Sequence, residues 1–201
     1  MDFSMDIGAL IGTIIAGAGI IWQMQRNRFN DYLALLASKE HFEARGRIFS
    51  RFCELNGEDL PAQFHKLINN DSNLKKDCDL EIALYERGGY SLPSMPWLKN
   101  AALSYAPNSN VLLWIILSNY IKSRRKNYSY DWARKFLWLT YKSIKKVIKR
   151  NKKNGIALFD KNGNEYKRFY EKDLITIKSE IRKEIKQKFQ IENNNLTTAS
   201  S

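Results

Sequence analysis

The run Val111-Leu-Leu-Trp-Ile-Ile-Leu117 is the strongest core signal in this chain of 201 residues. It continues through Tyr120 and Ile121 to a group of cations. The run is too short to cross a bilayer, which takes about 20 apolar residues, and it fits a helix buried on most sides. A re-entrant membrane contact is the alternative. Ser109 or Asn110 is expected to cap this helix.

Apolar residues recur at helical spacing on both sides of this run, so the fold class is expected to be mainly α. Asp131 is expected to cap the helix that follows, and Gly88-Gly89 to end the long helix before the run. The expected helices cover about residues 30–55, 61–70, 72–87, 97–105, 109–126 and 132–150.

The pattern changes after Asn154-Gly155. Two short runs, 156–159 and 165–170, flank an Asn-Gly turn at 162–163 and predict one β-hairpin near the C-terminus. A final amphipathic helix is expected from about Glu171 to Gln190, and the polar tail 191–201 is expected to be disordered.

The N-terminal segment from Ile7 to Met24 carries no charge. As a helix it would extend about 27 Å, close to the roughly 30 Å of bilayer hydrocarbon, with Trp22 near one interface. The sequence therefore predicts an N-terminal transmembrane helix. A cleaved signal peptide and a buried core helix are the alternatives.

The cations predict the orientation of this anchor. All 33 Lys and Arg residues follow Gln25, so the positive-inside rule places the N-terminus outside and the helical bundle in the cytoplasm, at a bacterial inner membrane. The expected divisions are an anchor at 1–25, a basic helical domain at 26–153, the hairpin and last helix at 154–190, and the tail at 191–201.

Small residues inside the anchor form a row of Gly8, Gly12 and Ala16. Such rows let two helices approach closely in lipid, so the anchor is a candidate site of homo-oligomerisation. The alternative is that a short anchor simply contains glycine.

Positive charge is concentrated between residues 122 and 153, which hold thirteen Lys or Arg residues and a single acid, Asp131. Aromatic residues are interleaved with these cations. The region could contact anionic lipid or nucleic acid, or it could be a solvated helix face. The candidate contact residues are Arg124, Arg125, Arg134, Lys142, Lys145, Lys146 and Lys149.

No catalytic motif is visible. His41 and His65 are the only histidines, and neither stands at metal-ligand spacing from another ligand. Cys53 and Cys78 are expected to be reduced core residues. We therefore expect a non-enzymatic protein without a cofactor or metal.

The segments Trp114-Ile-Ile-Leu-Ser-Asn-Tyr-Ile-Lys-Ser-Arg-Arg125 and Tyr130-Asp-Trp-Ala-Arg-Lys-Phe-Leu-Trp-Leu139 carry a family resemblance. The chain resembles a bacterial family of unknown function, made of small helical proteins with one N-terminal transmembrane helix. The resemblance covers about residues 1–145 and implies location and fold class, but no activity.

The function expected from these features is that of a membrane-anchored interaction or effector module at the cytoplasmic face, with an unknown protein partner. A role in stress or phage response follows only by analogy with small anchored effectors. A membrane-tethered nucleic-acid-binding protein and a membrane-permeabilising oligomer are the alternatives.

Overall fold

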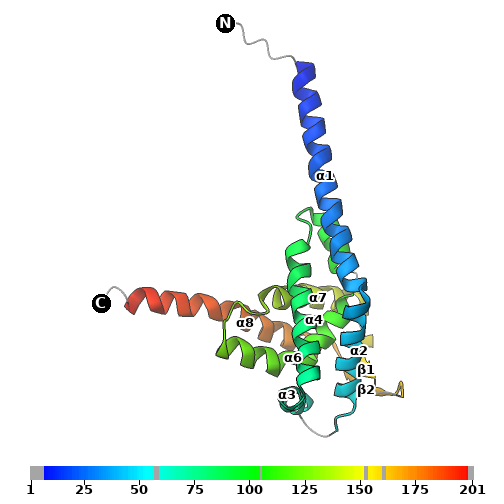
Figure 1. The fold of residues 1–201 in the computed structure, drawn as a ribbon, viewed down its shortest axis with the longest axis vertical. Coiled ribbons are helices and arrows are strands. Elements are labelled where there is room, and N and C mark those ends of the chain that lie inside the picture. Colours follow the sequence, from blue (N-terminus) through cyan, green and yellow to red (C-terminus); the bar gives the residue numbers. More distant parts are fainter. Residues whose placement is uncertain (1–6, 57–58, 105, 152–153, 160–161, 199–201) are drawn as a thin grey trace.

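The computed structural model describes residues 7–56, 59–104, 106–151, 154–159 and 162–198, with side chains described between 13 and 186. Within these ranges the chain is mainly helical, as expected, and it contains one small sheet (Figure 1). Its elements are α1 Ile7–Ala37, α2 Lys39–Cys53, α3 Leu60–Asn70, α4 Ser72–Ser91, α5 Pro96–Leu103, α6 Pro107–Asn127, α7 Arg134–Asn151, β1 Ile156–Phe159, β2 Glu165–Phe169 and α8 Glu171–Thr198.

Helix α6 lies at the centre of the body, which confirms the core helix predicted from its apolar run. Val111, Leu113 and Trp114 are at most 1% exposed, and α6 packs against both α7 and α3. The helix begins at Pro107, earlier than expected, because the fixed φ of proline suits a first helical turn. Asn110 is buried instead, and its Nδ2 donates to Ser143 Oγ of α7 at 3.0 Å.

The helix is interrupted between α1 and α2, where one continuous helix was expected. Ser38 causes this break, because it has an extended backbone and its Oγ accepts a hydrogen bond from the His41 N–H. A serine in that position caps the N-terminus of a new helix. The break lets α2 pack against α4.

Helix α4 continues through Gly88-Gly89, so the expectation that these glycines end the helix is wrong. They are sites of close approach: a Cβ on Gly88 would lie 3.2 Å from the Tyr32 ring of α1. The N-cap of α4 is Asp71, because its carboxylate accepts from the backbone N–H groups of Asn73 and Leu74.

The predicted hairpin is confirmed. β1 and β2 pair antiparallel, with Ile156 opposite Phe169 and a register shift between Leu158 and Phe159. Gly163 in the turn has a φ of +81°, which glycine adopts readily. Helix α8 continues to Thr198, past the expected end near 190, because no proline or glycine interrupts it. The last residues of the expected tail, 199–201, lie outside the described residues.

The expectation of an N-terminal transmembrane helix is wrong for the described part of the chain, where no helix is long and apolar enough to cross a membrane. The uncharged segment of α1 ends at Met24. The next residue, Gln25, already belongs to the body. Its side chain is buried, and its Oε1 accepts from the Ser94 N–H at 2.6 Å.

Candidate functional site

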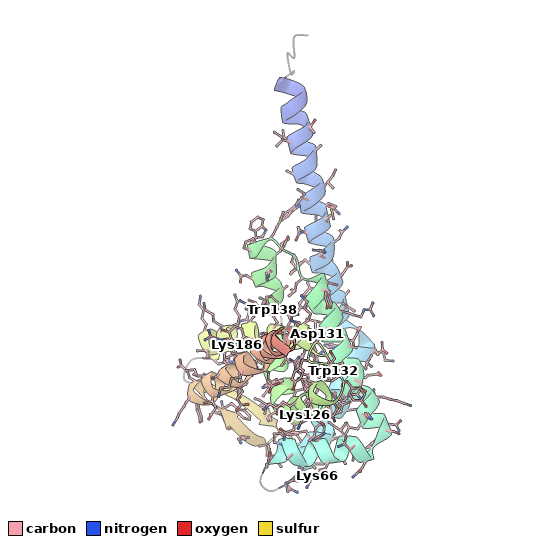
Figure 2. All side chains as sticks on the ribbon, turned by 90° about the vertical axis from the view of Figure 1, so that its left-hand side faces the viewer. Lys66, Lys126, Asp131, Trp132, Trp138 and Lys186 are labelled. Carbon is pink, nitrogen blue, oxygen red and sulfur yellow. The ribbon has the colours of Figure 1, made fainter. Side chains whose placement is uncertain are left out.

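One side of helix α7 carries four of the cations expected to contact anions. Arg134, Lys142, Lys145 and Lys149 are all exposed, and spacings of eight, three and four residues keep them on one side of the helix. Trp138 lies on the same side, half-buried (Figure 2). We call the four cations the basic stripe. Because the opposite side of α7 is buried in the core, the stripe faces outward.

The stripe keeps most of its charge unpaired. Among the described residues its only ion pair joins Arg134 to Asp131, at 3.4 Å. Lys146 is half-buried at the edge of the stripe, and the described residues offer it no carboxylate partner. The stripe therefore presents a positive surface to solvent.

Arg124 and Arg125 lie on α6 and do not belong to the stripe, and both are engaged within the fold. One Arg124 nitrogen lies 3.3 Å from Asp79 Oδ2. Arg125 is 2% exposed and donates to two backbone carbonyl oxygens, those of Trp132 at 2.8 Å and Glu184 at 3.1 Å. Burial lowers the pKa of the Arg125 guanidinium, and the Glu184 carboxylate opposes that shift. Arg125 thus joins α6 to α8.

A hollow of about 740 Å³ opens at the N-terminal end of the stripe, between the end of α4 and the loop that follows it, α5, α7 and α8. We call it the basic hollow, because three cations and one carboxylate line it. Figure 2 shows Asp131 and Trp138 on this part of the molecule. The side chains that define the hollow are those of Tyr90, Lys99, Asp131, Arg134, Lys135 and Trp138.

Aromatic rings hold the cations at the basic hollow. Lys99 Nζ lies 4.8 Å from the centroid of the Trp138 ring, and Lys142 Nζ lies 5.6 Å from the same ring. Lys135 Nζ lies 4.8 Å from the centroid of the Tyr90 ring. A ring face attracts an ammonium group without neutralising its charge. These contacts therefore place the cations and leave them able to attract an anion.

Helix α4 positions the start of α7, and with it the hollow. Glu86 Oε1 accepts from the Phe136 N–H at 2.8 Å, so a side chain of α4 satisfies an N-terminal amide of α7. Burial raises the pKa of the Glu86 carboxyl, and its hydrogen bonds from backbone N–H groups oppose that shift. Gly89 allows close approach, because a Cβ there would lie 2.6 Å from Lys135 Cβ.

A second polar cluster is closed inside the body. His41 Nδ1 lies 2.7 Å from Glu81 Oε2, and neither side chain is exposed. Arg45 Nε lies 3.5 Å from the other oxygen of that carboxylate. The Tyr85 ring packs edge-on against His41, with 5.2 Å between the ring centroids. Sequence reasoning missed this cluster because its members are far apart along the chain. Since the His41–Glu81 pair has no access to solvent, we assign it to joining α2 and α4.

An apolar hollow of about 680 Å³ lies on another part of the surface, between α3, α6, the hairpin and α8. Its lining includes Phe52, Trp114, Ile115, Leu158, Tyr166 and Ile177. Neither histidine and neither cysteine of the chain lines it. Its lining also includes the polar side chains of Asp59, Ser118, Lys167 and Glu180.

The first half of α1 projects from the body (Figure 1). We call its described residues 13–24 the N-terminal arm. Its large apolar side chains are exposed, namely those of Ile14, Ile15, Ile20, Ile21, Trp22 and Met24. Ala16 is exposed too, and Gly8 and Gly12 belong to α1 but precede the residues whose side chains are described. The arm thus presents an apolar surface that the body leaves uncovered.

The arm and the basic hollow adjoin each other. The Ser94 N–H, which donates to Gln25 at the base of the arm, belongs to a residue that lines the hollow. Trp22 lies against Trp97 of α5, with 6.4 Å between the ring centroids, and Lys99 follows two residues later. The apolar surface of the arm therefore lies directly beside the cationic surface of the basic hollow.

No family model, curated protein or solved structure matches this chain. The resemblance to a family of small membrane-anchored proteins stays a prediction.

Proposed function

We propose that the protein is a non-enzymatic interaction module that acts at an anionic membrane surface. The observation that carries this proposal is the junction between the exposed apolar arm and the basic hollow. An anionic bilayer presents an apolar layer beside a layer of phosphates, so the two adjoining surfaces of the protein match the two layers. The proposed surface is the cytoplasmic leaflet of a bacterial inner membrane.

The basic stripe supports this proposal through its charge. Each Lys or Arg near an anionic membrane contributes about 1 kcal/mol of binding free energy. The stripe extends away from the hollow along α7, so several cations can act together. Trp138 adds an amphipathic ring of the kind that is enriched at membrane interfaces.

Nucleic acid is the second candidate partner, because cations interleaved with Trp138 could hold phosphates and stack on bases. The arm separates the two candidates. Exposed isoleucines such as Ile14, Ile15, Ile20 and Ile21 match the apolar layer of a bilayer better than the charged backbone of a nucleic acid.

Vesicle flotation of the full chain tests the proposal. One set of vesicles is phosphatidylcholine alone, a second mixes phosphatidylcholine with phosphatidylglycerol, and a single-stranded oligonucleotide is titrated in parallel. The expected result is stronger binding to the mixed vesicles, with the difference between vesicle types shrinking as salt rises. Equal binding to both vesicle types, or steeply salt-dependent binding to the oligonucleotide alone, would contradict it.

A further inference from the structure

The basic hollow has the properties of a binding site for one small anion, and not only those of a positively charged surface. We propose that it binds the phosphate ester of a polyol, a chemistry shared by phosphatidylglycerol-type headgroups and by soluble glycerophosphates. This inference rests on the proposed function, because it names the lipid group that the membrane surface would offer. The volume of the basic hollow, about 740 Å³, lies within the range of ordinary ligand sites.

The phosphate would lie among Lys99, Arg134 and Lys135. These cations come from two helices, α5 and α7, so they can surround an anion in a way that a single helix face cannot. The rings of Trp138 and Tyr90 hold two of the ammonium groups at the hollow, 4.8 Å away in each case. Arg134 adds a planar guanidinium, the group best suited to donating two hydrogen bonds to one phosphate.

Asp131 indicates what the phosphate is attached to. Its carboxylate lines the hollow beside Arg134, where it would weaken the binding of a bare anion. A carboxylate accepts hydrogen bonds at several positions, so Asp131 can accept from ligand hydroxyl groups while it holds Arg134. Cations for a phosphate, together with an acceptor for hydroxyl groups, favour a polyol phosphate over a bare anion.

The apolar part of a lipid carrying this headgroup also has a place. The hollow meets the base of the arm at Ser94, and the exposed apolar side chains of the arm begin directly beyond Gln25. A headgroup in the hollow would therefore leave the acyl chains beside an apolar surface. A soluble glycerophosphate would use the hollow alone.

Calorimetric titration of the full chain with glycerophosphoglycerol and with inorganic phosphate tests the site. Lys99→Gln and Arg134→Gln are each expected to weaken glycerophosphoglycerol binding about fivefold, the factor that corresponds to one nearby cation. Lys145→Gln is the matched control, because it removes a stripe cation outside the hollow, and it should leave this binding unchanged. Circular dichroism confirms that each variant is folded.

Asp131→Ala separates a polyol phosphate from an arbitrary anion. Removing the carboxylate should strengthen the binding of inorganic phosphate and weaken that of glycerophosphoglycerol. Effects of the same sign on both probes would overturn the polyol part of the proposal. Binding of glycerophosphoglycerol that both Lys99→Gln and Arg134→Gln leave unchanged would overturn the site itself.

Flotation of the same variants tests this inference independently of the proposed function. It also distinguishes a lipid headgroup from a soluble glycerophosphate as the ligand. Weaker flotation of Lys99→Gln and Arg134→Gln than of Lys145→Gln on phosphatidylglycerol vesicles would support the headgroup. Glycerophosphoglycerol binding without flotation would support a soluble ligand and contradict the proposed function. A third outcome is that the protein floats with the vesicles equally well in all variants but does not bind glycerophosphoglycerol. This outcome would overturn the site and leave the proposed function standing.

Discussion

At the scale of single residues, Arg125 is a cation that the sequence predicts to lie at the surface, but it stabilises the packing of α6 against α8. Its guanidinium is buried between α6, the Trp132 carbonyl and α8. We expect Arg125→Met to lower the free energy of unfolding by about 2–4 kcal/mol, because two carbonyl oxygens and the Glu184 carboxylate lose their partner. Urea denaturation followed by circular dichroism measures this change.

Lys126→Met is the control for Arg125→Met. Lys126 is the next residue and is exposed, so the same new side chain there should change the free energy of unfolding by about 0.5 kcal/mol or less. Equal effects of the two substitutions would contradict the assignment of Arg125 to the core.

Asp71 predicts a dependence of stability on pH. Hydrogen bonds from backbone N–H groups at the start of α4, Leu74 first, lower the pKa of its carboxyl below the ordinary value of 3.8. A lowered folded pKa means that the stabilisation is present above about pH 3.8 and is lost as the pH falls through the lower folded value. The urea midpoint of the wild type should therefore exceed that of Asp71→Ala at neutral pH, and the difference should shrink in acid. A constant difference would contradict this cap.

Individual contacts were the least predictable part of this chain. The sequence places Arg124, Arg125 and Arg134 in one basic region, and nothing in it shows that Arg125 is enclosed by α8 or that Arg124 meets Asp79. The buried pair of His41 and Glu81 depends on how α2 and α4 pack. Spacing along the chain reports local geometry, and these contacts are long-range.

At the scale of elements, the glycines of α2 and α4 predict substitutions of opposite sign. Gly89→Ala should destabilise the protein by about 1–3 kcal/mol, because the new Cβ would lie 2.6 Å from Lys135 Cβ and push α4 from α7. Gly46→Ala should stabilise it by about 0.5–1 kcal/mol, because this helical glycine has open space around it. Thermal or urea denaturation compares the two, and a loss of stability in both variants would contradict the account.

Element types were predictable where the pattern is strong, as in the apolar run of α6, the helical periodicity of α7 and the Asn-Gly turn of the hairpin. Boundaries were less so, because Gly88-Gly89 can end a helix or let a neighbouring helix approach, and only the tertiary contacts decide between these roles. The break at Ser38 follows from its own side chain, so a closer reading of capping residues could have found it.

At the scale of the whole molecule, an exposed apolar arm adjoins a compact basic body (Figure 1). The sequence predicted both the apolar segment and the basic region, and the described residues correct the span expected of the first. The junction between them could not be predicted, because it depends on Gln25 meeting Ser94 and on Trp22 meeting Trp97. This junction is the basis of the proposed membrane contact.

The most direct test of that contact compares two variants of equal charge by flotation on mixed phosphatidylcholine and phosphatidylglycerol vesicles. One variant replaces Lys142, Lys145 and Lys149 of the basic stripe with Gln. The other replaces three exposed lysines outside the stripe, Lys39, Lys66 and Lys76, with Gln. We expect about a hundredfold weaker binding for the first variant and binding close to wild type for the second. Equal losses in both variants, or none in either, would contradict it.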